Sequence, residues 1–160
     1  PSRGLGDVYK RQKEDVLAAF SDKLPYFNTF GGNPVSIAAA QAVLKYIKDE
    51  NLQEHCKKAG AALLKALKEV QERHPESVGD VRGAGLFLGF EFVKNDGNKT
   101  PDKDMALNVI EMLRDEHILT SVIGHYGNIL KLRPPMVFSE NDIDWFATSL
   151  DKCITKLENK

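Results

Sequence analysis

The stretch VGDVRGAGLFLGFEFV, Val78 to Val93, decides the fold. It is rich in β-branched and aromatic residues, and glycines interrupt it. From Leu86 to Phe92 a large apolar residue stands at every second position, which is typical of a strand with one buried face. We therefore predict two short strands, near 78–82 and 86–93, joined or kinked at Gly83-Ala84-Gly85.

Before this stretch, the apolar residues recur at helical spacing. Residues 34–49, PVSIAAAQAVLKYIKD, are apolar on nearly every side, so we expect a helix buried between two bodies of structure. A second helix begins at Asn51, with apolar residues stepping by three and four, and ends at His74-Pro75.

After the stretch, Thr100-Pro101 predicts the N-cap and first residue of a third helix. ILTSV and NILKLRP read as strands around the turn GHYGN, and Ser139 with Asp142 predicts a capping box for the last helix. The order α-α-β-β-α-β-β-α predicts an α+β fold, with helices on one face of a small, mostly antiparallel sheet.

Composition limits the possible partners and chemistry. The 160 residues are 42% hydrophobic and carry a net charge of −1, so nothing favours a nucleic acid or an acidic membrane as partner. No apolar run approaches the length of a bilayer span. No Cys/His cluster has metal-ligand spacing, and we expect Cys56 and Cys153 to be buried thiols in a reducing compartment.

The first twelve residues, PSRGLGDVYKRQ, have no periodicity and do not lead into the segment that follows. They lack the apolar core of a signal peptide. We expect a non-native or disordered segment, such as a transit remnant or a cloning scar, and exclude residues 1–12 from the fold prediction.

The stretch YFNTFGGNPVS, residues 26–36, is the candidate phosphate site. Gly31-Gly32 allows positive φ, and Asn33-Pro34 reads as the N-cap and first residue of a helix. The Thr29 hydroxyl and free backbone N–H groups at this helix start could hold an anion such as phosphate. The alternative is a well-capped loop without a ligand.

Other motifs exclude common chemistries. Gly83, Gly85 and Gly89 have the spacing G-x-G-x-x-x-G and precede a strand, so they do not form a dinucleotide-binding loop. Neither G-x-S-x-G nor a Cys–His arrangement appears, and no complete catalytic set is visible.

Three motifs together resemble one family. FNTFGGNPVSIAAAQAVL, VGDVRGAGLFLGFEFV and NILKLRPPMVFSENDID occur in this order in class III pyridoxal-phosphate aminotransferases, which have fold type I. The resemblance implies that residues 13–50 are the end of the large domain and an inter-domain helix. Residues 51–160 would be the small C-terminal α+β domain.

The resemblance also implies a cofactor, pyridoxal 5'-phosphate, and a homodimer. Thr29 would contact the cofactor phosphate in the neighbouring subunit's active site. The family's cofactor-binding lysine lies upstream of T-F-G-G-N-P and matches no lysine here, so the chain alone should be inactive. The cytoplasm or the mitochondrial matrix is the expected compartment.

Lys131 and Arg133 are the candidate substrate-binding residues. Many family members carry Arg at the position of Lys131, where it pairs with a substrate carboxylate. NILKLRPPMVFS is similar instead to the ethanolamine-phosphate and phosphohydroxylysine phospho-lyases of the family, which eliminate phosphate from a phosphorylated amine. Lys131 and Arg133 fall on one face of a strand and could attract that phosphate, or could be ordinary solvated charges. For Arg82 we expect a structural role at the turn.

Three functions therefore stay open. The first is a phospho-lyase acting on a small amine substrate. The second is a class III transaminase that moves an amino group to a keto acid. The third is a non-catalytic α+β binding module.

Overall fold

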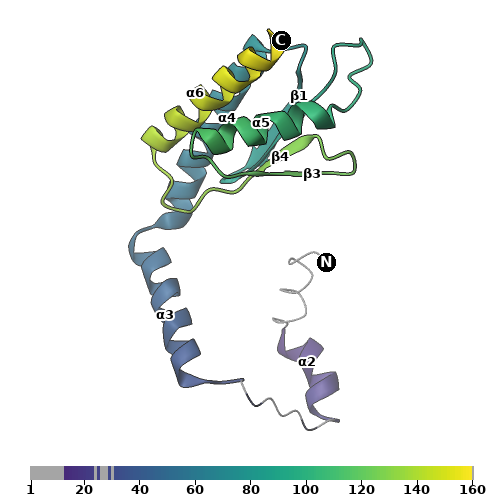
Figure 1. Cartoon of the computed structure of the whole chain (residues 1–160). Coiled ribbons are helices and arrows are strands. Elements are labelled where there is room, and N and C mark those ends of the chain that lie inside the picture. The colour runs from purple at the N-terminus through teal and green to yellow at the C-terminus, as the bar shows by residue number, and fades with distance from the viewer. Residues whose placement is uncertain (1–12, 24, 26–28, 30, 160) are drawn as a thin grey trace. The chain divides into compact units, whose positions relative to one another are not determined.

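A computed structural model describes residues 13–23, 25, 29 and 31–159 of the chain (Figure 1). The chain divides into two compact units between Val43 and Leu44, and each unit is described by itself. In chain order the elements are α2 (Glu14–Ser21), α3 (Pro34–Asp49), α4 (Leu52–Arg73), β1 (Val78–Ala84), β2 (Phe87–Phe92), α5 (Lys103–Asp115), β3 (Ser121–Ile123), β4 (Ile129–Leu132) and α6 (Glu140–Glu158).

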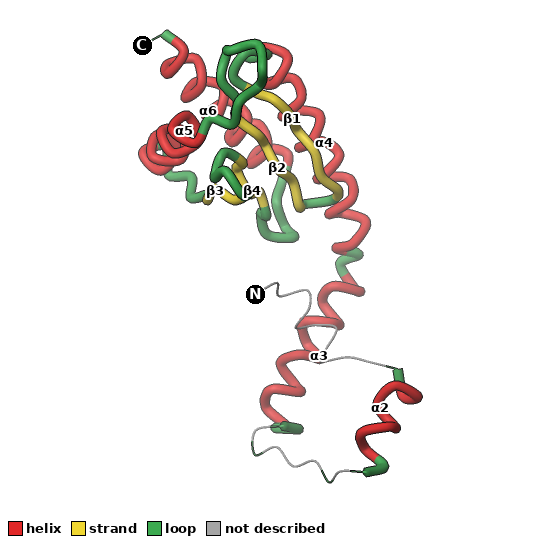
Figure 2. Tube along the Cα trace, turned by 90° about the vertical axis from the view of Figure 1, so that its right-hand side faces the viewer, coloured by secondary structure: helices red, strands yellow, loops and turns green. Residues whose placement is uncertain are grey.

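The second unit is built on a four-stranded sheet in the order β1-β2-β4-β3 (Figure 2). Each neighbouring pair of strands is antiparallel. Phe90 pairs with Val81 on one side and with Leu130 on the other, and Leu130 pairs in turn with Val122. These residues form one row across the sheet and share its inner face.

The inner face of the sheet and the apolar stripes of α4, α5 and α6 form the core. Phe90 is fully buried on β2, as are Leu67 on α4, Leu113 on α5 and Leu150 on α6. The alternation of apolar residues along β2 is therefore confirmed, with Leu88, Phe90 and Phe92 inward. The predicted fold class, helices on one face of a small antiparallel sheet, is confirmed.

Two element starts differ from the prediction. The N-cap of α5 is Asp102, whose side chain accepts a hydrogen bond from the Met105 amide at 2.9 Å. The predicted cap, Thr100, instead accepts from the Lys94 amide at 2.8 Å through its carbonyl oxygen, and Pro101 forms a bridge with Val93. Thr100 and Pro101 therefore belong to extended chain.

Strand β3 begins at Ser121, three residues later than ILTSV predicts. Its partner β4 ends at Leu132, shortly before Pro134-Pro135, which have no amide hydrogen for a ladder. The register would place Leu119 opposite Arg133 and Ile118 opposite Pro134, beyond the end of β4. The capping box of Ser139 and Asp142 at the start of α6 is confirmed.

The cysteine prediction is half correct. Cys153 is buried, and this burial raises the pKa of its thiol. Cys56, by contrast, is only partly buried on the first turns of α4, and both cysteines are free. Within the described part of the chain, no helix is long and apolar enough to cross a membrane.

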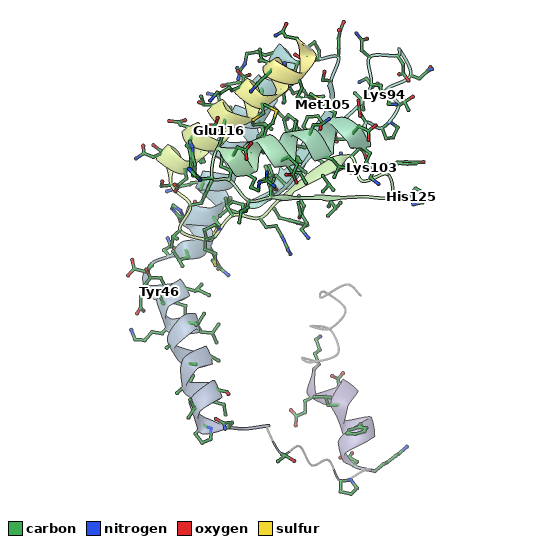
Figure 3. All side chains as sticks on the ribbon, viewed as in Figure 1. Tyr46, Lys94, Lys103, Met105, Glu116 and His125 are labelled. Carbon is green, nitrogen blue, oxygen red and sulfur yellow. The ribbon has the colours of Figure 1, made fainter. Side chains whose placement is uncertain are left out.

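Helix α3 contains no buried residue. Its apolar side chains are exposed; Val35 has 78% and Tyr46, labelled in Figure 3, has 54% of its surface exposed. An apolar helix that contributes nothing to a core is typical of a segment that packs against further structure. The helical prediction for residues 34–49 is confirmed, whereas its position between domains stays a prediction.

Candidate functional site

The segment around Thr29 precedes α3. Thr29 lies in a turn and is exposed. Asn33 caps the helix, because its side-chain oxygen accepts from the Val35 amide at 2.9 Å and the Ser36 amide at 3.2 Å. The predicted N-cap and the helix start at Pro34 are thus confirmed.

The capping by Asn33 corrects the expectation that free backbone N–H groups at this helix start could hold a phosphate. The amides of Val35 and Ser36 donate hydrogen bonds to the Asn33 side-chain oxygen, and Pro34 has no amide hydrogen. The first amides of α3 are therefore not free for an anion. What remains for a phosphate is the Thr29 hydroxyl beside a glycine turn. Gly32 has φ +72°, and no atom lies within 4 Å of the place where its β-carbon would stand. Thr29 and this open glycine surface fit a phosphate group.

Strand β4 positions Lys131. Leu130 and Leu132 point into the core, and Lys131, between them, points to the outer face of the sheet. Arg133 follows the strand directly, two positions beyond Lys131, and is exposed. The structure therefore brings the two predicted substrate-binding residues together, while Thr29 belongs to the other unit.

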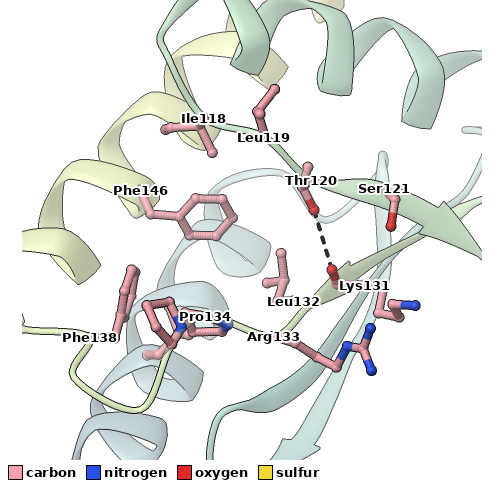
Figure 4. Close-up of a pocket in the computed structure, with 12 residues that line it drawn as sticks. Ile118, Leu119, Thr120, Ser121, Lys131, Leu132, Arg133, Pro134, Phe138 and Phe146 are labelled. Atoms are coloured by element: carbon pink, nitrogen blue, oxygen red, sulfur yellow. Dashed lines mark hydrogen bonds between the residues drawn. The ribbon is translucent and has the colours of Figure 1, made fainter. Parts of the chain in front are cut away.

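Lys131 and Arg133 both line a cavity of about 510 Å³ at the end of the sheet (Figure 4). In this view the charged ends of both side chains point to the same side of the cavity. Neither forms an ion pair within the described part of the chain. The remaining lining residues are apolar or carry hydroxyls: Leu63, Ile118, Leu119, Thr120, Ser121, Leu132, Pro134, Pro135, Phe138 and Phe146.

Two neighbouring cations without a carboxylate partner repel each other, and an anion removes that repulsion. The apolar wall beside them lowers the exposure of a bound anion to water. The arrangement can therefore hold a small organic anion, with its charge at Lys131 and Arg133.

Arg82 is engaged elsewhere. Its guanidinium donates to Glu91 at 2.7 Å, which ties β1 to β2, and also to Asp80 on its own strand. These hydrogen bonds, that to Glu91 first, raise the pKa of Arg82. Its role is structural, although the bond to Glu91 joins β1 to β2, the bond to Asp80 lies within β1, and neither holds the turn.

Sequence reasoning missed the hydroxyl residues beside Lys131. Thr120 donates from its hydroxyl to the Lys131 carbonyl oxygen at 3.3 Å, and Ser121 is the β3 partner of Lys131. Only the strand register shows this proximity. His125 stands in the turn between β3 and β4 (Figure 3), stacked edge-on against Tyr126, and does not line the cavity.

The described residues contain no group of three or more His, Cys, Asp or Glu side chains that could hold a metal ion. The polar groups of the cavity are two cations and two hydroxyls, which suit an anion and not a metal ion.

Comparison with known proteins agrees with this fold. The family model described as aminotransferase class-III matches residues 10–154. The chain is 42% identical over 144 residues to the ethanolamine-phosphate phospho-lyase homolog 1 of Caenorhabditis elegans, covering 89% of this chain and 31% of that protein. It is 37% identical over 141 residues to the mitochondrial alanine–glyoxylate aminotransferase 2 homolog 2 of Arabidopsis thaliana, covering 88% and 29%.

Among solved structures, the chain is similar to a phospholyase from Arthrobacter in complex with phosphoethanolamine. The TM-score is 0.86 at 35% identity, over 90% of this chain and 34% of that one. The fold is thus that of the fold-type I pyridoxal-phosphate enzymes. The chain belongs to the class III aminotransferase family, which depends on pyridoxal phosphate. It spans about a third of the length of the relatives it matches.

Proposed function

We propose that the full-length protein is a phospho-lyase that eliminates phosphate from a small phosphorylated amine. The observation that carries this proposal is the pair of unpartnered cations, Lys131 and Arg133, lining one cavity. Two relatives support it by name: the nematode phospho-lyase homolog and the Arthrobacter phospholyase whose structure is a complex with phosphoethanolamine.

The positive charge of Lys131 and Arg133 suits the phosphate leaving group of this reaction. In the elimination the bond between carbon and the phosphate oxygen breaks, and the phosphate leaves with the electron pair. Overall, a phosphorylated amine and water give an aldehyde, ammonia and inorganic phosphate. Lys131 and Arg133 would bind and orient the phosphate and stabilise the charge it carries away.

Pyridoxal phosphate, when bound, would supply the electron sink that allows a proton to be removed from the amine-bearing carbon. Thr29 would hold the cofactor phosphate through its exposed hydroxyl, in the active site of the neighbouring subunit of a homodimer. The exposed apolar residues of α3 would be covered by the large domain in the complete enzyme. In this proposal residues 13–50 end the large domain and residues 51–160 form the small one.

The 160-residue chain alone should not catalyse the reaction. None of its lysines lies in the motif of the family's cofactor-binding lysine. The proposed compartment is the cytoplasm or the mitochondrial matrix, and the Arabidopsis relative is named as mitochondrial.

The second candidate function is an ordinary transaminase. The 37% identity to an alanine–glyoxylate aminotransferase homolog favours it. Transaminases recognise a carboxylate, however, and the planar fork of an Arg fits that group better than the point charge of Lys131.

A product assay separates the two functions. The full-length enzyme, loaded with pyridoxal phosphate, is incubated with phosphoethanolamine, and inorganic phosphate and ammonia are measured. A parallel reaction contains alanine and glyoxylate, and pyruvate is measured. We expect phosphate release to be faster than transamination. Keto acid from amino donors, with no phosphate from any phosphorylated amine, would establish the transaminase.

A further inference from the structure

We propose that Ser121 is a third phosphate-binding residue, which determines specificity for phosphate over carboxylate. The proposal rests on the proposed function, because it concerns the same substrate phosphate. In it, the Ser121 hydroxyl donates a hydrogen bond to the phosphate that Lys131 and Arg133 attract.

The strand register places Ser121 beside Lys131. The two residues are direct partners on the antiparallel strands β3 and β4. Direct partners point to the same face of a sheet, with β-carbons about 4.5–5.5 Å apart. Ser121 is exposed, and it lines the cavity together with Lys131 and Arg133 (Figure 4).

The other flank of Lys131 offers no donor. Its partner there is Gly89, which has no side chain. The next residue in this row, Arg82, is bound to Asp80 and Glu91. Among the residues paired with Lys131 across the sheet, a free donor is therefore found on the β3 side.

The two hydroxyls on that side have different tasks. Thr120 already donates to the Lys131 carbonyl oxygen, which anchors the start of β3 to β4. The Ser121 hydroxyl has no partner within the described part of the chain. It is therefore free to bind a ligand on the outer face.

This combination of donors matches a phosphate monoester. Three terminal oxygens point in different directions and need donors from more than one strand. A carboxylate has two oxygens in one plane and is bound best by a single guanidinium. A lysine, an arginine and a hydroxyl around one space are thus better suited to phosphate.

The test uses the full-length holoenzyme, in which the cofactor's own phosphate already occupies its site. Affinity for inorganic phosphate is measured by titration calorimetry for wild type and Ser121→Ala. The loss of one hydrogen bond to a charged group should weaken phosphate affinity about tenfold. Ser121→Thr keeps the hydroxyl and should restore most of the affinity.

Two further variants provide controls. Thr155→Ala removes an exposed hydroxyl on α6, outside the cavity, and should leave phosphate affinity unchanged. Lys131→Ala should weaken it at least as much as Ser121→Ala. The Michaelis constant for phosphoethanolamine should rise with Ser121→Ala, whereas that for alanine should not.

The outcomes separate this proposal from the proposed function. If wild type releases no phosphate but Ser121→Ala still weakens phosphate binding, the lyase reaction is wrong and the Ser121 site stands. If phosphate affinity and the Michaelis constant for phosphoethanolamine are unchanged in Ser121→Ala, the Ser121 site is wrong whichever reaction occurs. An equal rise in the Michaelis constants for phosphoethanolamine and alanine would show a merely structural role and also overturn it.

Discussion

Gly60 of α4 lies directly against the backbone of Gly85 in the turn between β1 and β2. A β-carbon at Gly60 would stand 2.1 Å from the Gly85 carbonyl oxygen. Gly85 itself has φ +53°, a conformation in which a side chain is unfavourable. Gly60 and Gly85 therefore allow α4 to approach the turn between β1 and β2 closely.

Gly60→Ala should consequently destabilise the chain. Overpacking usually costs about 1–3 kcal/mol, and a backbone atom cannot rotate away, whereas alanine returns about 1 kcal/mol of helix propensity. Because the clash is with backbone, we take the upper end of the overpacking cost, about 3 kcal/mol, and expect a net loss of about 2 kcal/mol in the free energy of unfolding, measured by urea denaturation. Ala62→Gly, at an exposed position of the same helix, is the control and should cost about 1 kcal/mol. A Gly60→Ala variant that is as stable as wild type, or more stable, would contradict the close approach of α4 to Gly85.

His74 joins the end of α4 to the end of α6. Its Nδ1 lies 2.7 Å from Glu158 and its Nε2 lies 3.2 Å from Asp151, and the side chain is 6% exposed. Ser77 also donates to Glu158, at 2.6 Å. His74→Ala would leave both carboxylates without this partner, which should cost about 1–3 kcal/mol of stability.

Arg73→Ala is the matched control for His74→Ala. Arg73 pairs with Asp151 at 2.6 Å, but half of its side chain is exposed, so the pair should be worth about 0–1 kcal/mol. Both variants are compared by urea denaturation. Similar losses in the two would mean that the buried histidine contributes no more than a surface ion pair.

Asp142 makes the stability contributed by the start of α6 depend on pH. The Ser139 hydroxyl, and then the Ser139 amide, donate to its carboxylate and lower the pKa of Asp142. A lowered pKa means that the ionised form stabilises the folded chain. This contribution is fully present above the pKa of an unfolded Asp, about 3.9, and is lost as pH falls through the lower folded value.

The prediction is tested with Asp142→Asn from pH 7 down to pH 2.5. The stability difference from wild type should shrink towards the acid end, because wild type loses the same charge there. Asp144→Asn, on the same helix but outside the capping box, is the control for the substitution itself. A difference for Asp142→Asn that stays constant over this range would rule out the ionised cap.

The fold was predictable where the pattern is local. Alternation along β2 and the three- and four-residue steps of α4 suffice to predict a strand and a helix with the correct buried faces. The start of α5 was not predictable in this way. Thr100-Pro101 and Asp102 are both acceptable caps locally, and the bridge between Val93 and Pro101, which selects Asp102, is a tertiary contact.

The candidate site shows the same limit. Lys131 and Arg133 share a face because their spacing is two, which the sequence contains. The pairing of Lys131 with Ser121, ten positions away, depends on the length and shape of the intervening turn. The engagement of Arg82 by Asp80 and Glu91 likewise depends on register.

Thr29→Ala should weaken cofactor retention in the full-length enzyme. One hydrogen bond to a charged phosphate is worth about 1.5–3 kcal/mol, which is roughly a 10- to 150-fold rise in the dissociation constant. The fold should be little affected, since Thr29 is exposed. Cofactor release is followed by absorbance, with Thr29→Ser as the variant that keeps the hydroxyl. Unchanged cofactor affinity in Thr29→Ala would remove Thr29 from the proposed site.

Lys131→Arg should move substrate preference from phosphate to carboxylate. The guanidinium keeps the positive charge that attracts a phosphate, and its planar fork adds a bidentate match to a carboxylate that the point charge of a lysine lacks. We expect kcat/KM for phosphoethanolamine to fall relative to that for alanine by about tenfold, the equivalent of one hydrogen bond.

Lys57→Arg, at an exposed position on α4, is the control for the substitution itself and should leave the ratio of the two kcat/KM values unchanged. The measurement is a competition assay in which inorganic phosphate and pyruvate are determined in the same reaction. A ratio unaffected by Lys131→Arg, and likewise by Lys131→Ala, would mean that Lys131 is a solvated strand charge and that the substrate phosphate is bound elsewhere.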